Sequence, residues 1–364
     1  MNIIINSEDF VQHLSKVIGV VDRKQTMPIL GHVLITGSSG EITLTSTDLE
    51  VQISSKFKSN IPDDFSITLP GRKLFDILRS LGNTDIELTA DNDTVVLKTP
   101  KSKFSLQQLP SNEFPLFDET DSNQSFTIKQ QELSDIFNKT QFAMAQQDVR
   151  FYLNGLLLEI GSETLNVVGT DGHRLAKTNI SLDKKNINDQ SCIIPRKAIQ
   201  ELSKSLSETK DCKVCLVENQ ASFSYSQVTL TTKLIDGTFP DYNRVIPEST
   251  TTNIMLDTSI LKPALQRVSI LANEKFRGVR IDIDNDKITI SSENPEQEQA
   301  VEDIDIDGTN VKLSIGFNVS YLIDAVNACN GELVTLGVND ETTSALITDP
   351  SDPNTKYVVM PMRL

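Results

Sequence analysis

The sequence predicts an α+β fold made of three tandem copies of one domain. The first observation is a repeat: Gly31, Gly155 and Gly278 lie 124 and 123 residues apart, and each begins a segment of two alternating strands with a polar turn between them. The second is that a strand running into a helix follows each segment, as in "LPGRKLFDILRSLG" and "IPRKAIQELSKSL". Polar connectors at 118–125 and 247–253 separate the copies. We therefore expect domains at 1–120, 126–246 and 252–364.

Two segments of each copy space their apolar residues as an amphipathic helix does, for example Phe10, Leu14 and Val17. This spacing predicts six helices, over 8–24, 71–82, 131–147, 196–208, 259–273 and 317–329. Shorter segments such as "EITLTS" and "KITISS" alternate polar and apolar residues between turn residues, which is typical of antiparallel strands. Helices and strands in this order give the α+β class.

The composition favours a reduced, cytoplasmic protein. The chain has no run of about 20 apolar residues that could span a membrane, and its N-terminal residues lack the pattern of an export signal. Four cysteines, Cys192, Cys212, Cys215 and Cys329, are too few and too scattered for a disulfide framework. We expect no cofactor, no metal and no contact with membranes.

The net charge of −16 argues against loose adhesion to nucleic acid, which normally requires a basic surface. The charge is unevenly distributed, however. The six predicted helices contain 12 basic and 9 acidic residues, so they carry +3 and the remaining residues −19. A solvated helix face accounts for this difference about as well as a nucleic-acid surface does, and the repetition of the helices favours the second interpretation.

Two local patterns resemble redox or metal sites. "CKVC" at 212–215 has the spacing of such a site, but it lies in a predicted strand and no second pair of cysteines or histidines follows. "DIDNDKITISSE" places acidic residues at calcium-loop positions, but Lys287 occupies the place that needs glycine, and strands replace the flanking helices. Alternation of aspartate and isoleucine is better explained by a strand with one solvated face.

The segment "TDGHRL" at 170–175 suggests an acid/base pair because Asp171 and His173 lie two residues apart. No nucleophile motif accompanies them, and the other histidines, His13 and His32, belong to another copy. The first copy has "TDLEVQI" at the corresponding strand end, so we expect the altered sequence to form a binding site on one copy. An enzyme that uses this pair and a purely structural repeat scaffold are the alternatives.

Motifs along the whole chain resemble those of the bacterial DNA polymerase III beta subunit family of sliding clamps. They are "TMPILG" at 26, "QDVRFYLNG" at 147, "TDGHRLA" at 170, "IIPRK" at 193, "DGTFPDY" at 236, "NEKFRGVR" at 273, "NPEQEQA" at 294, "GFNVSY" at 316 and the terminal "YVVMPMRL". The resemblance implies a head-to-tail homodimer closed into a ring, with two helices of each copy lining the hole and antiparallel sheets outside. Such a ring would encircle double-stranded DNA as a non-catalytic processivity factor. Its partners would be the replicative polymerase, the clamp loader and other DNA-processing proteins.

The same resemblance implies DNA contacts at Lys24, Arg72, Gln147, Phe151, Tyr152, Arg196 and Lys197. Phe151 departs from the tyrosine that the family often has there, so we expect one hydroxyl contact to be lost. Ordinary packing at the start of a strand is the alternative for Phe151 and Tyr152. Enclosure by a ring would explain why weakly basic helices suffice in an acidic chain, because a topological link needs little attraction.

In the family, a groove between the second and third domains takes up a short apolar peptide from each partner. Here it would be lined by Leu153, Thr170, Gly172, His173, Arg174, Leu175, Pro240, Arg244, Val245, Asn318, Tyr321, Ser344, Val359, Met360, Pro361, Met362 and Arg363. Leucine, valine, methionine and proline would form an apolar slot, with His173 and Arg174 at its rim. The tail would form one wall, because Pro361 cannot continue a strand ladder.

Ring closure would join two edge strands of opposite charge, "KSKFSL" at 101–106 and "NPEQEQAVED" at 294–303. The contact would be heterologous and would depend mainly on apolar burial, because exposed ion pairs contribute little. The residues expected in it are Lys101, Lys103, Phe104, Leu106, Ile270, Leu271, Glu296, Glu298 and Glu302.

Overall fold

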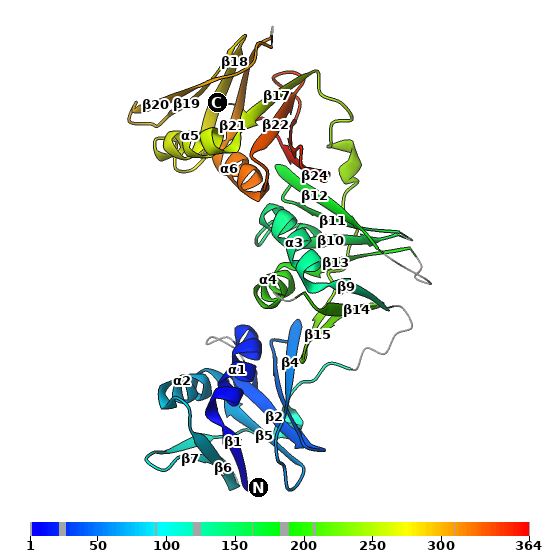
Figure 1. Cartoon of the computed structure of the whole chain (residues 1–364), viewed down its shortest axis with the longest axis vertical. Coiled ribbons are helices and arrows are strands. Elements are labelled where there is room, and N and C mark those ends of the chain that lie inside the picture. The colour runs from blue at the N-terminus through cyan, green and yellow to red at the C-terminus, as the bar shows by residue number, and fades with distance from the viewer. Residues whose placement is uncertain are drawn as a thin grey trace. The chain divides into compact units, whose positions relative to one another are not determined.

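The computed structural model describes residues 2–21, 27–91, 93–118, 125–161, 163–182, 189–206, 209–309 and 311–363. Within these residues the chain forms six α-helices and 24 strands, and every strand pair is antiparallel (Figure 1). The predicted α+β class is confirmed. None of the described helices is long and apolar enough to cross a membrane.

One order of elements, a strand, a helix and three strands, occurs twice in each copy. The first copy contains β1 (Asn2–Asn6), α1 (Ser7–Val17), β2 (His32–Ser38), β3 (Glu41–Thr47), β4 (Val51–Lys58), β5 (Phe65–Pro70), α2 (Gly71–Leu81), β6 (Asp85–Asp91), β7 (Thr94–Lys98) and β8 (Lys103–Gln107). The second contains β9 (Ser125–Lys129), α3 (Gln130–Thr140), β10 (Gly155–Ile160), β11 (Thr164–Thr170), β12 (Arg174–Ser181), β13 (Gln190–Pro195), α4 (Arg196–Ser205), β14 (Asp211–Val217), β15 (Gln220–Tyr225) and β16 (Val228–Lys233). The third contains β17 (Thr252–Asp257), α5 (Thr258–Ile270), β18 (Gly278–Asp284), β19 (Lys287–Glu293), β20 (Gln299–Asp305), β21 (Lys312–Asn318), α6 (Val319–Ala328), β22 (Leu333–Val338), β23 (Ala345–Asp349) and β24 (Asp352–Val359).

The chain divides into two compact units, residues 1–134 with 197–234, and residues 135–196 with 235–364. Unit 1 contains a four-stranded sheet of order β1-β6-β7-β8 and an eight-stranded sheet of order β5-β2-β3-β4-β16-β15-β14-β9. Unit 2 contains a four-stranded sheet of order β20-β19-β18-β21 and an eight-stranded sheet of order β13-β10-β11-β12-β24-β23-β22-β17. Each eight-stranded sheet therefore joins strands from two consecutive copies.

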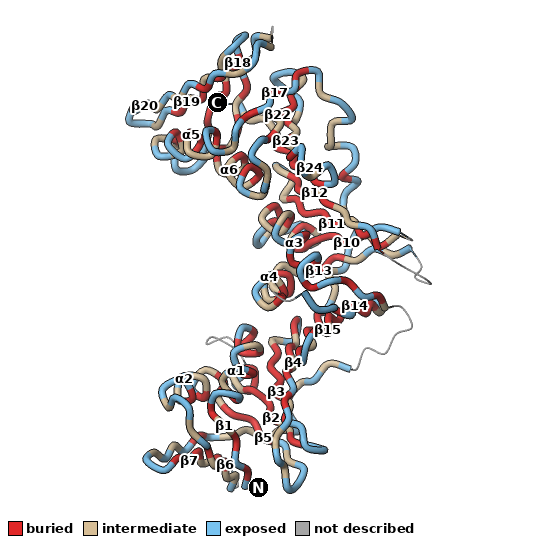
Figure 2. Tube along the Cα trace, viewed as in Figure 1, coloured by how far each residue is buried: buried red, intermediate tan, exposed pale blue. Residues whose placement is uncertain are grey.

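The helices cover one face of these sheets. In unit 1, α1 packs on β3, β4 and α2, and in unit 2, α5 packs on β19, β20 and α6. Alternating strand residues supply the core, as Val279, Ile281 and Ile283 do in β18, and Figure 2 shows the buried positions concentrated where helices and sheets meet. The two-residue period of the strands and the helical period of the helices thus bury the predicted apolar faces.

Three helices begin at a side-chain cap, and α1 and α3 end well before the predicted residues. Asn6, Asp257 and Asn318 each accept a hydrogen bond from the backbone N–H two residues later, at the starts of α1, α5 and α6. The helix predicted over 131–147 ends at Thr140, because the next residues bond elsewhere: Ala145 N–H donates to Leu153 O at 2.9 Å. The helix predicted over 8–24 ends at Val17 and continues as a short 3₁₀ turn to Val20.

Candidate functional site

A cavity of about 200 Å³ opens in unit 2 beside the turn between β11 and β12. Its apolar part includes the buried side chains of Leu153, Leu175 and Val358. A recess of this size accepts one or two apolar side chains of a ligand, with polar groups at the edge to orient it. The lining residues are Arg150, Tyr152, Leu153, Thr170, Gly172, Arg174, Leu175, Pro240, Asp241, Tyr242, Val245, Val358 and Met360.

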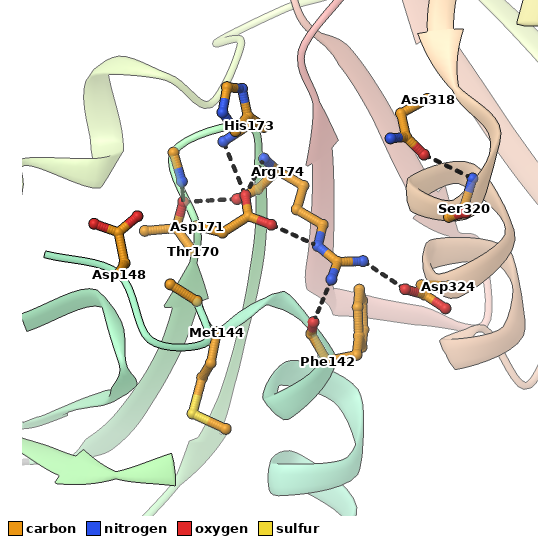
Figure 3. Close-up of polar contacts among 12 residues, drawn as sticks. Phe142, Met144, Asp148, Thr170, Asp171, His173, Arg174, Asn318, Ser320 and Asp324 are labelled. Atoms are coloured by element: carbon orange, nitrogen blue, oxygen red, sulfur yellow. Dashed lines mark hydrogen bonds and ion pairs between the residues drawn. The ribbon is translucent and has the colours of Figure 1, made fainter. Parts of the chain in front are cut away.

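The turn at 170–174 is held by its own side chains (Figure 3). Thr170 Oγ1 accepts a hydrogen bond from Gly172 N–H at 3.1 Å and donates one to Arg174 O at 2.6 Å. Asp171 Oδ1 accepts hydrogen bonds from His173 N–H at 2.9 Å and Arg174 N–H at 3.0 Å. The carboxylate that looked like half of an acid/base pair is thus a turn cap, and His173 contributes its backbone N–H.

Arg174 joins the turn to two other elements of unit 2. Its Nε donates to Asp171 Oδ2 at 3.1 Å, its Nη1 to Asp324 Oδ2 of α6 at 2.5 Å, and its Nη2 to Phe142 O at 2.7 Å (Figure 3). The guanidinium also lies 4.5 Å from the ring centre of Tyr321. Since only 14% of the Arg174 side chain is exposed, these contacts fix the guanidinium, and the cavity borders the rest of the side chain.

Arg150 also contacts the turn. Its Nε and Nη2 donate to the two carboxylate oxygens of Asp148 at 3.0 and 2.8 Å, and Nη2 also donates to Asp171 O at 3.0 Å. Hydrogen bonds from Arg150 lower the pKa of Asp148 to about 2, so this carboxylate stays ionised at neutral pH. A Cβ atom at position 172 would lie 3.0 Å from Arg150 Nη1, and Gly172 has a φ of +89°. Glycine therefore permits both the backbone conformation and the approach of Arg150.

The tail after β24 runs along the turn. Arg174 pairs with Val359 in the register of β12 and β24, and Met360 N–H then donates to His173 O at 2.9 Å. Met362 N–H donates to Gly316 O of β21 at 2.8 Å. These backbone bonds hold Met360 at the edge of the cavity.

The structure brings part of the predicted peptide site together around this cavity: Leu153, Thr170, Gly172, Arg174, Leu175, Pro240, Val245 and Met360. The other predicted residues do not border it: His173, Arg244, Asn318, Tyr321, Ser344, Val359, Pro361, Met362 and Arg363. Asn318 caps α6, Tyr321 lies against Arg174, and Val359 is buried within β24. Met362 and Arg363 border a separate recess together with Phe276. The part that these residues play in ligand binding stays a prediction.

Sequence reasoning missed four lining residues: Arg150, Asp241, Tyr242 and Val358. One signal could have revealed Val358, because it lies two residues before Met360 and strand alternation places such residues on one face. Tyr242 depends on tertiary contacts, since its hydroxyl donates to Glu159 Oε2 at 2.5 Å and its ring lies 4.9 Å from Lys177 Nζ.

The residues predicted to contact DNA have different surroundings, and Lys24 lies outside the described residues. Arg72 donates to Val21 O at 3.2 and 3.0 Å, and Arg196 to Met144 O at 3.0 Å. Burial lowers the pKa of Arg196. Lys197 forms an ion pair with Asp48. Of the three remaining predicted contacts, Gln147 is exposed, Phe151 is 72% exposed and Tyr152 lines the cavity.

Comparisons with known proteins identify the family. Residues 1–118, 127–241 and 243–363 match the N-terminal, central and C-terminal domains of the DNA polymerase III beta subunit. The chain belongs to the DNA polymerase III beta subunit family. It is similar to the beta sliding clamps of Pseudomonas putida and Escherichia coli K12, at 40% and 37% identity over the full length of both chains. A crystal structure of the Pseudomonas aeruginosa beta subunit superposes with a TM-score of 0.97 at 38% identity. A solved structure of the Caulobacter crescentus pol III beta superposes with a TM-score of 0.95 at 32% identity, and each comparison covers both chains completely.

Of the residues expected at the subunit interface, Lys103, Phe104 and Leu106 lie in β8 and Glu302 lies in β20, whereas Lys101, Glu296 and Glu298 precede those strands. Lys101 and Lys103 are exposed at β8, with Phe104 half-buried and Leu106 buried. Ile270, at the end of α5, is 76% exposed. Leu271, the second apolar residue expected in the interface, follows Ile270 directly. The acidic residues expected there are Glu296, Glu298 and Glu302. Glu302 already accepts hydrogen bonds from Arg267 of its own subunit at 2.6 and 2.8 Å, so it is not a free partner for a lysine.

The two patterns that resembled redox or metal sites lie in strands. "CKVC" lies in β14, where Cys212 and Cys215 are both buried, and burial raises the pKa of Cys212 to about 12. The acidic segment forms the hairpin of β18 and β19. Within the described ranges, no group of three or more His, Cys, Asp or Glu side chains is placed to hold a metal ion.

Proposed function

We propose that the chain forms a head-to-tail homodimeric ring that encircles double-stranded DNA without sequence specificity and tethers the replicative polymerase and other proteins to it. The observation that carries this proposal is the pairing of strands between consecutive copies, which leaves two corresponding strands at sheet edges. β4 of the first copy pairs with β16 of the second, and β12 of the second pairs with β24 of the third. The corresponding strands β20 and β8 each lie at the edge of a four-stranded sheet.

Pairing β20 of one subunit with β8 of another would repeat the internal junction and complete both four-stranded sheets. Since each subunit has one edge of each kind, the contact is heterologous and must propagate until it closes. Membership of the sliding clamp family supports closure after two subunits. Open edges of this kind invite aggregation in a monomer, so a closed ring also explains why they are tolerated.

The junction within unit 1 predicts a register for this pairing. Lys58 of β4 and Asp305 of β20 hold corresponding places, because each pairs with the first residue of the preceding strand. Gln107 of β8 and Lys233 of β16 correspond to each other for the same reason. In the junction within unit 1, the residues four positions before Lys58 and Lys233 face each other as Ser54 and Thr229. Transferred to the subunit contact, this register puts Lys103 opposite Val301, Phe104 opposite Ala300, and Ser105 opposite Gln299.

Cysteine cross-linking tests the register. The double variant Ser105→Cys, Gln299→Cys should form intersubunit disulfides under mild oxidation. The Cα atoms of directly opposed residues in antiparallel strands lie about 4.5 to 5.5 Å apart, which is close enough for a disulfide. The matched variant Ser105→Cys, Asp303→Cys moves one thiol four residues along β20 and should remain uncross-linked. Equal cross-linking of the two variants would exclude this register.

The apolar centre of the contact has its own test. Ile270→Ala with Leu271→Ala should give monomers in sedimentation, because burying a leucine-sized side chain contributes about 1.5 to 3 kcal/mol and a surface ion pair only about 0 to 1 kcal/mol. An unchanged dimer would remove α5 from the proposed interface.

Retention on DNA tests the function itself. A ring loaded on circular duplex DNA should remain bound during gel filtration and should be lost within minutes after one cut by a restriction enzyme. Blocking both ends of the linear product with bound protein should restore retention. Equal loss from circular and linear DNA would contradict encirclement.

The cavity in unit 2 is proposed to receive a short apolar peptide from each partner. Two apolar anchors at about 1.5 to 3 kcal/mol each support only micromolar-range binding after association costs, which suits a site that partners share in turn. Deleting residues 360–364 should abolish binding of a Gln-Leu-x-Leu-Phe type peptide in fluorescence anisotropy while the dimer persists, and Leu175→Ala should weaken it partially. Full-strength binding by the truncated protein would place the peptide site elsewhere.

A non-catalytic, cytoplasmic processivity factor is the proposal that fits the family. The turn contacts of Asp171 support it, because this carboxylate is committed to backbone N–H groups and Arg174. Highly purified protein should hydrolyse neither ATP nor DNA. Hydrolysis that disappears in His173→Ala would instead favour the enzyme alternative.

A further inference from the structure

Asp48 lies in the turn between β3 and β4 of unit 1, and its two carboxylate oxygens have different partners. Oδ1 accepts hydrogen bonds from Glu50 N–H at 3.0 Å and Val51 N–H at 2.7 Å. Oδ2 forms an ion pair with the ammonium group of Lys197 in the first turn of α4. Only 9% of the Asp48 side chain is exposed, against 38% of Lys197, so the carboxylate is covered and the lysine still reaches solvent.

The first turns of α2 and α4 have an unusual charge. Arg72 and Lys73 follow Gly71 in the first turn of α2, and Arg196 and Lys197 begin α4. Neither helix has an acidic residue in its first turn. A helix N-terminus already carries partial positive charge, so cations there are unfavourable unless an anion approaches. In α4 that anion is Asp48, which comes from the preceding copy of the domain.

Arg72 offers an internal comparison, because it holds the place in α2 that Lys197 holds in α4. Its guanidinium donates to Val21 O, a neutral acceptor, at 3.2 and 3.0 Å. Arg196 likewise donates to the carbonyl oxygens of Met144 and Ala145. Both arginines therefore keep their net positive charge, whereas the charge of Lys197 is cancelled by Asp48.

We propose that Asp48 limits the grip of the ring on DNA by competing with backbone phosphates for Lys197. The inference rests on the proposed function, in which Lys197 faces the duplex. A DNA phosphate can form an ion pair with Lys197 only by displacing the Asp48 carboxylate, which the turn already holds in place. The contact is therefore weak and easily exchanged, and the ring keeps its hold on DNA through enclosure.

Asp48→Asn separates this role from the turn. Asparagine keeps a side-chain oxygen for the N–H groups of Glu50 and Val51, but it replaces the charged oxygen beside Lys197. The matched control is Asp211→Asn, which changes the net charge equally and breaks an exposed ion pair with Lys129, at 2.5 Å, in the same unit. Binding of the full-length proteins to a short labelled duplex at low salt is measured by anisotropy, alongside melting and sedimentation to verify the folded dimer.

Asp48→Asn should bind the duplex about two- to fivefold more tightly than the parent, the increment expected of one partly exposed ion pair. The slope of log affinity against log salt should steepen by about 0.9, since one more phosphate is neutralised. Asp211→Asn should change neither quantity. Lys197→Ala should remove the whole gain in the Asp48→Asn background.

The inference is overturned if Asp48→Asn binds no more tightly than Asp211→Asn, or if its gain survives Lys197→Ala. Those results leave the ring untouched, because retention on circular DNA is measured separately. Failure of both the parent and Asp48→Asn to bind duplex, together with equal loss from circular and cut DNA, would overturn the proposed function as well.

Discussion

The turns at 47–51 and 170–174 are the same structure used for two purposes. Thr47 Oγ1 accepts a hydrogen bond from Leu49 N–H at 3.1 Å, as Thr170 Oγ1 does from Gly172 N–H at 3.1 Å. The middle residue has positive φ in both, +78° at Leu49 and +89° at Gly172. The repeat therefore preserves a backbone conformation even where leucine must adopt it with some strain.

The aspartates of the two turns continue the comparison. In both, Oδ1 caps the turn and the other oxygen holds a cation. The cation for Asp48 is Lys197, from another copy, while the cation for Asp171 is Arg174 of the same turn. The copied turn thus supplies a rigid frame, and a few substitutions on it decide whether it borders a pocket or restrains a lysine.

The largest expected effect comes from Arg174→Ala, because it removes a cation that only the second turn has. Asp324 and the carbonyl of Phe142 would lose their partner, so the free energy of unfolding should fall by about 2 to 3 kcal/mol. Urea denaturation measures it. Arg174→Lys keeps the charge without the planar guanidinium and should recover part of the lost unfolding free energy. If Arg174→Ala changes the unfolding free energy by less than about 0.5 kcal/mol, these contacts make no net contribution to stability.

Gly172→Leu gives the second turn the leucine that the first turn has at this place. Its main effect should be on peptide binding. The backbone can accommodate leucine, as Leu49 demonstrates, at a cost of about 1 kcal/mol in unfolding free energy. The new side chain must displace Arg150 and narrow the cavity, so peptide affinity should fall by about tenfold or more, measured by anisotropy. The reciprocal variant Leu49→Gly is the control and should leave peptide affinity unchanged.

Asp171→Asn should have a smaller effect, because asparagine can still cap the turn. It would lose the ion pair with Arg174, in which the Arg174 side chain is 14% exposed and the Asp171 side chain 16% exposed. The unfolding free energy should therefore decrease by about 1 kcal/mol. Peptide affinity should fall less than in Gly172→Leu. A larger loss of affinity in Asp171→Asn would show that Arg174, not the space beside Gly172, dominates the pocket.

His173→Ala should have the smallest effect. The exposed imidazole adds nothing to the cap, which uses the backbone N–H that alanine also has. We expect unfolding free energy within about 0.5 kcal/mol of the parent value and no change in dimerisation.

Most of the fold could be predicted, because its signals are local and repeated. The spacing of Phe10, Leu14 and Val17 depends only on which face of a helix is buried, and all three are fully buried in α1. Helix ends were less predictable: the apolar residues from Ala143 to Ala145 continue the composition of α3 but are buried outside it. The N–H of Ala145 donates to Leu153 O, a partner that no local pattern indicates.

The sequence by itself determined the three copies, their α+β class and the correspondence of the segments at 47–51 and 170–174, since these follow from local periodicity and from comparison of the copies. Only the tertiary structure decided what those turns do. Asp48 meets Lys197, and Arg174 meets Asp324, each across about 150 residues of chain. Such pairs form because sheet registers bring distant elements together, and no spacing along the chain encodes that distance.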